Sequence, residues 1–199
     1  ILDTLKVLNL IMKINNSQEL FKKASNIIPS QSQTFSKSWT QYPFGCSPIF
    51  ADKADGGYIW DVDGNKFIDW PMALGPLILG HNNKKVNTAL MKRLQEGIAF
   101  SLPNKLEVEL SEKLINWFPF GEAIRFGKNG SDVTSAAVRA ARAYTNKEHI
   151  LCCGYHGWQD WFIGTTSRNR GIPNSVKNLT HAFAYNDITD LKFLLSKYS

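Results

Sequence analysis

The feature that most constrains the fold of this chain is the alternation of strand-like and helix-like segments in its second half. Two parallel strands need a crossover connection, and a helix is its usual form. The alternation therefore favours a parallel sheet of the α/β class. The strand-like segments cover 123–126, 149–153 and 181–185, and the helical segments cover 131–144 and 187–198.

The first half of the chain has a different pattern. A β-type pattern runs from 49 to 70, and inside it Asp63-Gly64-Asn65 is a turn sequence typical of a β-hairpin. Ser17 is a favourable N-cap at the start of an amphipathic segment. The predicted hairpin strands cover 57–62 and 66–70, and the predicted helices cover 17–28, 83–96 and 105–117.

Composition argues against several classes of protein. The chain is 43% hydrophobic and 20% charged, which is typical of a globular protein and not of a disordered one. Its net charge of +6 comes from scattered lysines and arginines without a recognisable nucleic-acid-binding module. An anionic phosphorylated cofactor accounts for this charge equally well. The apolar segment 1–14 is too short, and too often interrupted by polar residues, to span a membrane.

Cysteine and histidine spacing argues against disulfides and metal sites. Cysteines are odd in number and two of them are adjacent, which is a poor disulfide framework and lacks zinc-ligand spacing. A reducing, cytoplasmic setting is therefore expected. No histidine has a second ligand at close sequence spacing, so no metal is predicted. These residues are Cys46, Cys152 and Cys153, and His81, His149, His156 and His181.

Two short motifs suggest a cofactor. Asn129-Gly130-Ser131-Asp132 begins an alanine-rich helical segment, and a helix N-terminus offers backbone N–H groups and a hydroxyl to a phosphate. Gly154-Tyr155-His156-Gly157 places an aromatic ring and an imidazole between two glycines. Taken singly, the first motif is more often a plain helix cap and the second more often loop packing. Together, a phosphate cup and a stacking ring are what pyridoxal 5'-phosphate (PLP) needs.

The order of four motifs resembles the class III PLP-dependent aminotransferases, and within them the glutamate-1-semialdehyde 2,1-aminomutase-like group. The motifs are the run from Asp61 to Asp69, Leu79-Gly80-His81, and the two motifs around Ser131 and Tyr155. The similarity runs from about Ser17 to the last residue. It implies the α/β architecture called PLP-dependent transferase fold type I. The chain would contribute the N-terminal segment and the first half of the mostly parallel sheet of the large domain.

The same resemblance divides the chain into three parts. Residues 1–16 would be an extended or non-native N-terminus. Residues 17–72 would be the N-terminal segment of the small domain, made of a helix, a loop and the hairpin. Residues 73–199 would be the first, incomplete part of the PLP-binding large domain.

The resemblance also implies roles for individual residues. Asn129, Gly130 and Ser131 would bind the cofactor: Gly130 and Ser131 would hold its phosphate, and Asn129 stands where the family often has serine. Tyr155 would stack on the pyridine ring and form one wall of the cofactor site, and His156 would support the Tyr155 ring.

The resemblance further implies which residues would meet the substrate. Thr34 and Lys37 stand where the mutases have a serine and an arginine that meets the substrate carboxylate. Lysine can pair with a carboxylate but lacks the bidentate fork of arginine, which argues against the mutase reaction. The sequence therefore also allows an aminotransferase for another keto or aldehyde substrate, such as one of a surface-sugar pathway.

In this family, a downstream lysine forms the internal aldimine, and none of the 17 lysines here stands at its position. We therefore expect an N-terminal fragment that has no catalytic residue and is inactive alone. The whole enzyme would be a cytoplasmic homodimer. Its substrates would be a small-molecule amino donor and a keto or aldehyde acceptor. One alternative is a truncated, non-catalytic protein that associates with a full-length homologue. The other is a chain that misfolds because half a sheet leaves an open edge.

Overall fold

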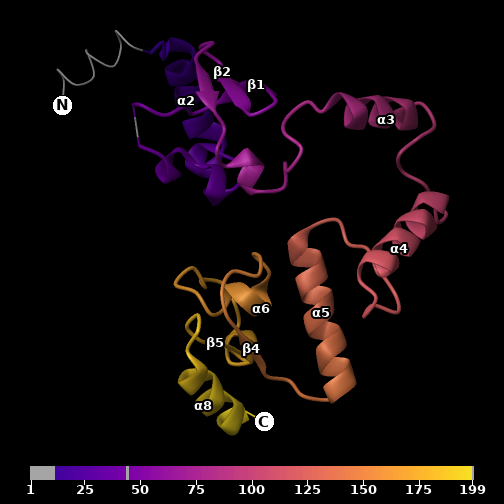
Figure 1. The fold of residues 1–199 in the computed structure, drawn as a ribbon. Coiled ribbons are helices and arrows are strands. Elements are labelled where there is room, and N and C mark those ends of the chain that lie inside the picture. The colour runs from indigo at the N-terminus through magenta and orange to yellow at the C-terminus, as the bar shows by residue number, and fades with distance from the viewer. Residues whose placement is uncertain (1–11, 44, 199) are drawn as a thin grey trace. The chain divides into compact units, whose positions relative to one another are not determined.

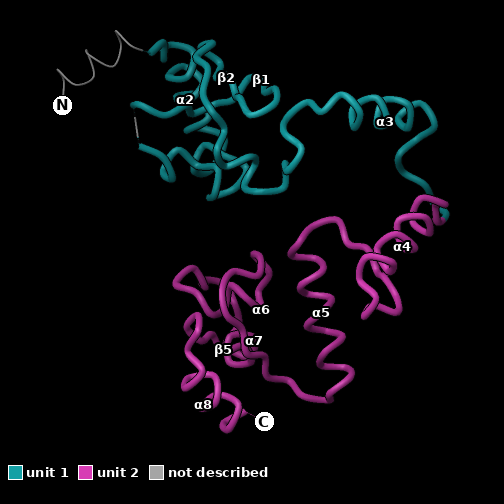
Figure 2. Tube along the Cα trace, in the orientation of Figure 1, with its two compact units in different colours: residues 1–102 teal, residues 103–199 magenta. Residues whose placement is uncertain are grey.

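The computed structural model describes residues 12–43 and 45–198, and the chain divides into two compact units between Leu102 and Pro103 (Figure 2). Residues up to 102 are called the first unit here and residues from 103 the second unit. Most of the predicted N-terminal part, 1–16, lies outside the described residues. The predicted division at residue 72 stays a prediction.

The first unit begins with helix α2 (Asn15–Ile27), which starts two residues before the predicted position. Ser17 was expected to cap this helix, and that prediction is wrong. The carboxylate of Asp63 accepts hydrogen bonds from the backbone nitrogens of Asn16 (2.7 Å) and Ser17 (2.9 Å). The helix is therefore capped by the hairpin turn, 46 residues further along the chain.

A three-stranded antiparallel sheet lies beside α2 (Figure 1). The predicted hairpin is confirmed, and a preceding strand extends it. The carboxylate of Asp61, which is 2% exposed, accepts hydrogen bonds from the backbone nitrogens of Asp63 (3.0 Å) and Asn65 (2.8 Å) and so fixes the turn. The strands are β1 (Ala51–Asp55), β2 (Tyr58–Asp61) and β3 (Lys66–Ile68).

The remaining helices of the chain's first two thirds follow local signals. Asn83 caps α3 (Lys84–Leu94), and a capping box of Asn104 and Glu107 begins α4 (Lys105–Trp117), which has the predicted bounds. Short 3₁₀ turns occupy the loops, at Pro29–Gln31, Phe35–Lys37, Trp39–Gln41 and Met72–Leu74.

The second unit contains the predicted parallel pair of strands. Strands β4 (Ile150–Cys152) and β5 (Thr180–Ala182) are parallel, with Ile150 opposite Thr180. The helices around them are α5 (Gly130–Thr145), α6 (Asp160–Ile163), α7 (Asn174–Lys177) and α8 (Ile188–Tyr198). Helix α8 lies beside the strands (Figure 1). The α/β class is thus confirmed.

The strand predicted at 123–126 does not form, and that prediction is wrong for this structure. These residues have neither helix nor strand conformation. A strand exists through its ladder of hydrogen bonds, and no strand within the described ranges pairs with this segment. The composition of this segment favours a strand, but a partner strand within the described ranges is missing.

The packed interior is small. Among the described residues, the hydrophobic side chains that are buried are those of Ala24, Cys152 and Phe162. Several large apolar side chains are exposed in both units, including Trp70, Ile78 and Phe120. Within 12–43 and 45–198, no helix combines the length and apolar character needed to cross a membrane.

The capping contact of Asp63 gives a prediction about pH. Partial burial raises the pKa of Asp63, but hydrogen bonds from Ser17 and Asn16 lower it more, so the pKa lies below its usual 3.8. A carboxylate with a lowered folded-state pKa stabilises the fold above its unfolded pKa, and this contribution is lost as the pH falls through the folded value. We expect α2 to lose stability below pH 3.8, measured by hydrogen exchange of its amides. Asp63→Asn should destabilise α2 by about 1 kcal/mol at neutral pH and remove this pH dependence. An unchanged pH profile in the variant would contradict the assignment.

Candidate functional site

The first turn of α5 has the features of an anion-binding site. The backbone nitrogens of Gly130 and Ser131 have no hydrogen-bond acceptor among the described residues, as expected for the start of a helix. The carboxylate of Asp132 accepts a hydrogen bond from the Asn129 nitrogen (3.1 Å) and holds this turn. Apart from its chain neighbours and the backbone of its own helix, no atom lies within 4 Å of the position that a Cβ would take on Gly130, so this side of the helix start is open. The two free donors and the helix dipole favour a phosphate here.

The loop after β4 passes directly against this turn. Gly157 has a φ of 112°, and a Cβ on it would lie 2.9 Å from the Ser131 Cβ. The Trp158 nitrogen donates to the Ser131 hydroxyl (3.4 Å), and the Thr134 hydroxyl donates to the His156 carbonyl oxygen (2.9 Å). The structure therefore brings together the two motifs that the sequence separates by about two dozen residues.

The two rings of this loop have different environments. Tyr155 is 76% exposed, and its ring meets Phe162 edge to face with centroids 5.5 Å apart. His156 is half-buried, and its Nε2–H donates to the Cys153 carbonyl oxygen (2.8 Å). The His156 ring also lies nearly parallel to Trp161. Tyr155 can thus present a free face to a planar ligand while His156 is fixed behind it.

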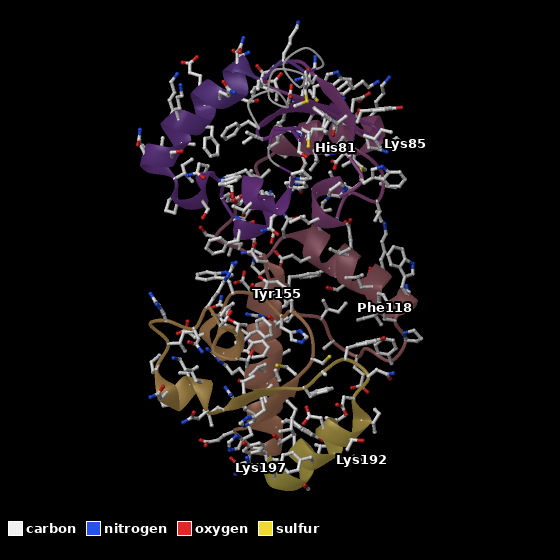
Figure 3. The ribbon with its side chains drawn as sticks, turned by 90° about the vertical axis from the view of Figure 1, so that its left-hand side faces the viewer. His81, Lys85, Phe118, Tyr155, Lys192 and Lys197 are labelled. Carbon is white, nitrogen blue, oxygen red and sulfur yellow. The ribbon has the colours of Figure 1, made fainter. Side chains whose placement is uncertain are left out.

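Two lysines of the second unit lie far from this place. Tyr155 lies at the end of the unit where α5 begins, whereas Lys192 and Lys197 of α8 lie at the opposite end (Figure 3). Neither lysine is in a position to reach a ligand held at the first turn of α5.

Thr34 and Lys37 are exposed and belong to the first unit. The Lys37 backbone nitrogen donates to the Thr34 carbonyl oxygen (3.1 Å) in a 3₁₀ turn. Their predicted contact with a substrate stays a prediction.

The motif Leu79-Gly80-His81 has a structural role in the first unit. The Nε2 atom of His81 lies 2.6 Å from Asp69 Oδ2, and the pair is largely buried. Backbone hydrogen bonds join His81 to Gly56 in both directions (2.8 and 3.0 Å). Gly80 has a φ of 80°, and a Cβ there would lie 3.1 Å from the Gly56 carbonyl oxygen. Two of the motifs that carry the family resemblance are therefore tied to each other.

The sequence spacing missed one histidine contact. His149 Nδ1 lies 3.0 Å from His181 Nε2, because the parallel strands bring together residues 32 positions apart. Burial, together with the neighbouring His149 and Lys197, lowers the pKa of His181. No group of three or more metal-ligating side chains occurs in the part of the chain that the structure describes.

Sequence reasoning also missed the residues that support the site. These are Thr134 and Ser135, which lie three and four positions after the predicted Ser131 and share its face of α5. All three bond to the segment that contains residues 156–161. A row of hydroxyl side chains at helical spacing in an alanine-rich helix was the available signal.

A family model decides which family this is. The model for class III aminotransferases matches residues 42–195, which is most of the chain. The chain belongs to this family. The family that the motifs predicted is thus confirmed.

The curated relatives of this family member include both enzyme types. Over 185 residues it is 36% identical to a 3-aminobutyryl-CoA aminotransferase of Cloacimonas acidaminovorans (strain Evry). The match covers 92% of this chain and 44% of the relative. Over 195 residues it is 34% identical to a glutamate-1-semialdehyde 2,1-aminomutase of Methanothrix thermoacetophila, again with 92% and 44% covered.

A solved structure confirms the fold of this class III family member. The FumI protein of Sphingopyxis sp. MTA144, solved in its PLP internal aldimine form, is 30% identical and has a TM-score of 0.82. The match covers 92% of this chain and 43% of that protein. The predicted fold class, that of PLP-dependent transaminases, is confirmed for the part that the chain covers. The chain spans less than half the length of each of these three proteins.

Proposed function

We propose that this chain is the cofactor-binding part of a PLP-dependent enzyme that transfers amino groups, either an aminotransferase or an aminomutase. The observation that carries the proposal is the contact between the first turn of α5 and the loop after β4. It places two free backbone N–H groups and the Ser131 hydroxyl beside a loop that presents the exposed ring of Tyr155. These residues fit a ligand that combines a phosphate and a flat ring.

Each residue has a distinct part in this proposal. Gly130 and Ser131 hold the phosphate through their N–H groups and the Ser131 hydroxyl, and Asn129 shapes the turn before them. Tyr155 stacks on the pyridine ring. His156 supports this wall because its Nε2–H is bonded to the Cys153 carbonyl oxygen. PLP, when bound, supplies an electron sink for amino-group chemistry.

Further parts of the proposal concern the whole enzyme. We propose a cytoplasmic homodimer that takes a small-molecule amino donor and a keto or aldehyde acceptor, with no catalytic residue in this chain. Thr34 and Lys37 would meet the substrate. Their difference from serine and arginine argues against the mutase reaction and leaves room for an aminotransferase with another keto or aldehyde substrate, such as one of a surface-sugar pathway.

A second candidate function is association with a longer homologue without catalysis. The exposed apolar side chains of Trp70, Ile78 and Phe120 favour it, because such surfaces are usually covered by protein. The two candidates differ in whether the chain serves amino-group transfer or only associates with the homologue, and PLP binding without aldimine formation fits the second as well.

Titration with PLP tests the proposed function. We expect the 199-residue chain to bind PLP reversibly, as followed by absorbance and by quenching of tryptophan fluorescence. Tyr155→Ala should weaken binding by about 2- to 10-fold, since an aromatic stack contributes about 0.5–1.5 kcal/mol. Tyr144→Ala is the matched control, because Tyr144 is 93% exposed near the far end of α5. Failure of the unsubstituted chain to bind PLP, or equal affinities of the two variants, would count against the proposal.

A further inference from the structure

Trp161 links the loop of the candidate site to the body of α5. It lies in α6, and its indole N–H donates to the Ser135 hydroxyl (3.1 Å), 26 residues away in sequence. The bond is partly buried, so it is shielded from competition with water. Ser135 lies one turn beyond Ser131 on the same face of α5. The indole is thus held relative to the helix that forms the proposed phosphate cup.

The ring of Trp161 also lies behind His156. The two rings are nearly parallel, at an angle of 23°, with centroids 6.1 Å apart. Both side chains line an open, mostly apolar hollow of about 360 Å³ between α5 and β4. The His156 ring is held by its bond to the Cys153 carbonyl oxygen, by the edge-to-face contact with Phe162 (5.4 Å between centroids) and by the Trp161 ring.

We propose that Trp161 is a positioning residue for the cofactor ring. Its bond to Ser135 and its contact with His156 hold the loop 154–157 at the distance from α5 at which Ser131 and Tyr155 engage the same PLP molecule. Trp161 acts through His156 and the loop, without touching the cofactor. The inference rests on the proposed function.

Three variants of the 199-residue chain test this role. Trp161→Phe removes the N–H donor and keeps an aromatic ring, and Ser135→Ala removes the acceptor. Each should weaken PLP binding by about 2- to 12-fold, which corresponds to the contribution of about 0.5–1.5 kcal/mol from a hydrogen bond of this kind. The double variant should bind no more weakly than either single one, because both changes remove the same bond. Trp117→Phe is the matched control, since Trp117 is 71% exposed at the end of α4.

Two further measurements separate positioning from loss of structure. Competition by inorganic phosphate reports on the first turn of α5 alone, so its inhibition constant should not change in Trp161→Phe. Hydrogen exchange of the amides of residues 155–158 should become faster, while exchange in α8 stays the same. A general loosening of the second unit would change the PLP affinity, the inhibition constant of phosphate and the exchange rates in α8 together.

The outcomes separate this inference from the proposed function. Unchanged PLP affinity in Trp161→Phe, or additive losses in the double variant, would overturn the positioning role and leave the proposed function standing. Failure of the unsubstituted chain to bind PLP would overturn both. A parallel loss of phosphate and PLP binding would show a structural role only and would also overturn the inference.

Discussion

Gly157→Ala is expected to weaken PLP binding by the 199-residue chain at least about 30-fold. Gly157 has a φ of 112°, where an L-residue is strained, and a Cβ there would lie 2.9 Å from the Cβ and 3.1 Å from the Cα of Ser131. The backbone strain alone costs about 1–3 kcal/mol. The close contact can be relieved only by moving the loop away from α5. That movement separates Tyr155 from the proposed phosphate cup.

A variant at a second glycine distinguishes the effect of backbone strain from the effect of the close contact with Ser131. Gly171 also has a positive φ, of 83°, but nothing lies within 4 Å of its Cβ position. Gly171→Ala therefore carries the strain without the contact, and we expect it to lower stability while PLP affinity changes little. The measurement is PLP affinity for both variants, together with their unfolding in urea. Equal affinities would mean that the approach of Gly157 to Ser131 does not set the geometry of the site.

The parts of the fold that could be predicted from the sequence are those with local signals. Helix α4 has its predicted bounds because Asn104 and Glu107 form a capping box within four residues. The hairpin follows from Asp63-Gly64-Asn65, whose turn is fixed by its neighbour Asp61. In both cases the deciding contacts lie a few positions apart in the sequence.

The features that could not be predicted depend on distant contacts. Asp63 caps α2 from the hairpin turn, so the first residues of the helix do not reveal their cap. The segment 123–126 has the composition of a strand but lacks a neighbour. The strands predicted at 149–153 and 181–185 begin at His149 and His181, but the sequence does not show that these two strands are neighbours and so bring the two rings together.

In the candidate site, too, the residues with local sequence signals could be predicted and those that depend on distant contacts could not. Asn129, Gly130, Ser131, Tyr155 and His156 could be found as motifs, and the structure brings Ser131 together with the Tyr155 loop. They are supported by Thr134, Ser135, Trp161 and Phe162. The spacing of the two hydroxyl residues marks one face of α5, but it does not show that this face meets the loop.

Phe162→Ala should have the largest effect on stability, a loss of about 3–5 kcal/mol from the free energy of unfolding of the second unit. Phe162 is 5% exposed and is the largest of the buried hydrophobic side chains within the described residues. Its ring meets those of Tyr155, His156 and Trp161 at centroid distances of 5.4 to 5.8 Å. Urea unfolding followed by circular dichroism measures the loss. Phe120→Ala is the control, because Phe120 is 87% exposed and should change stability by less than about 0.5 kcal/mol.

Phe162→Leu distinguishes filling of the core from support of the rings. Leucine keeps most of the volume, so we expect a loss below about 1.5 kcal/mol in stability. It removes the edge-to-face contact with Tyr155, however, so PLP affinity should fall further than this small destabilisation accounts for. Wild-type affinity in Phe162→Leu would mean that Phe162 fills space and that the orientation of Tyr155 is set by the loop backbone alone. Because the same side chain packs the second unit and contacts both rings, stability and PLP binding should fall together in Phe162→Ala and separate only in Phe162→Leu.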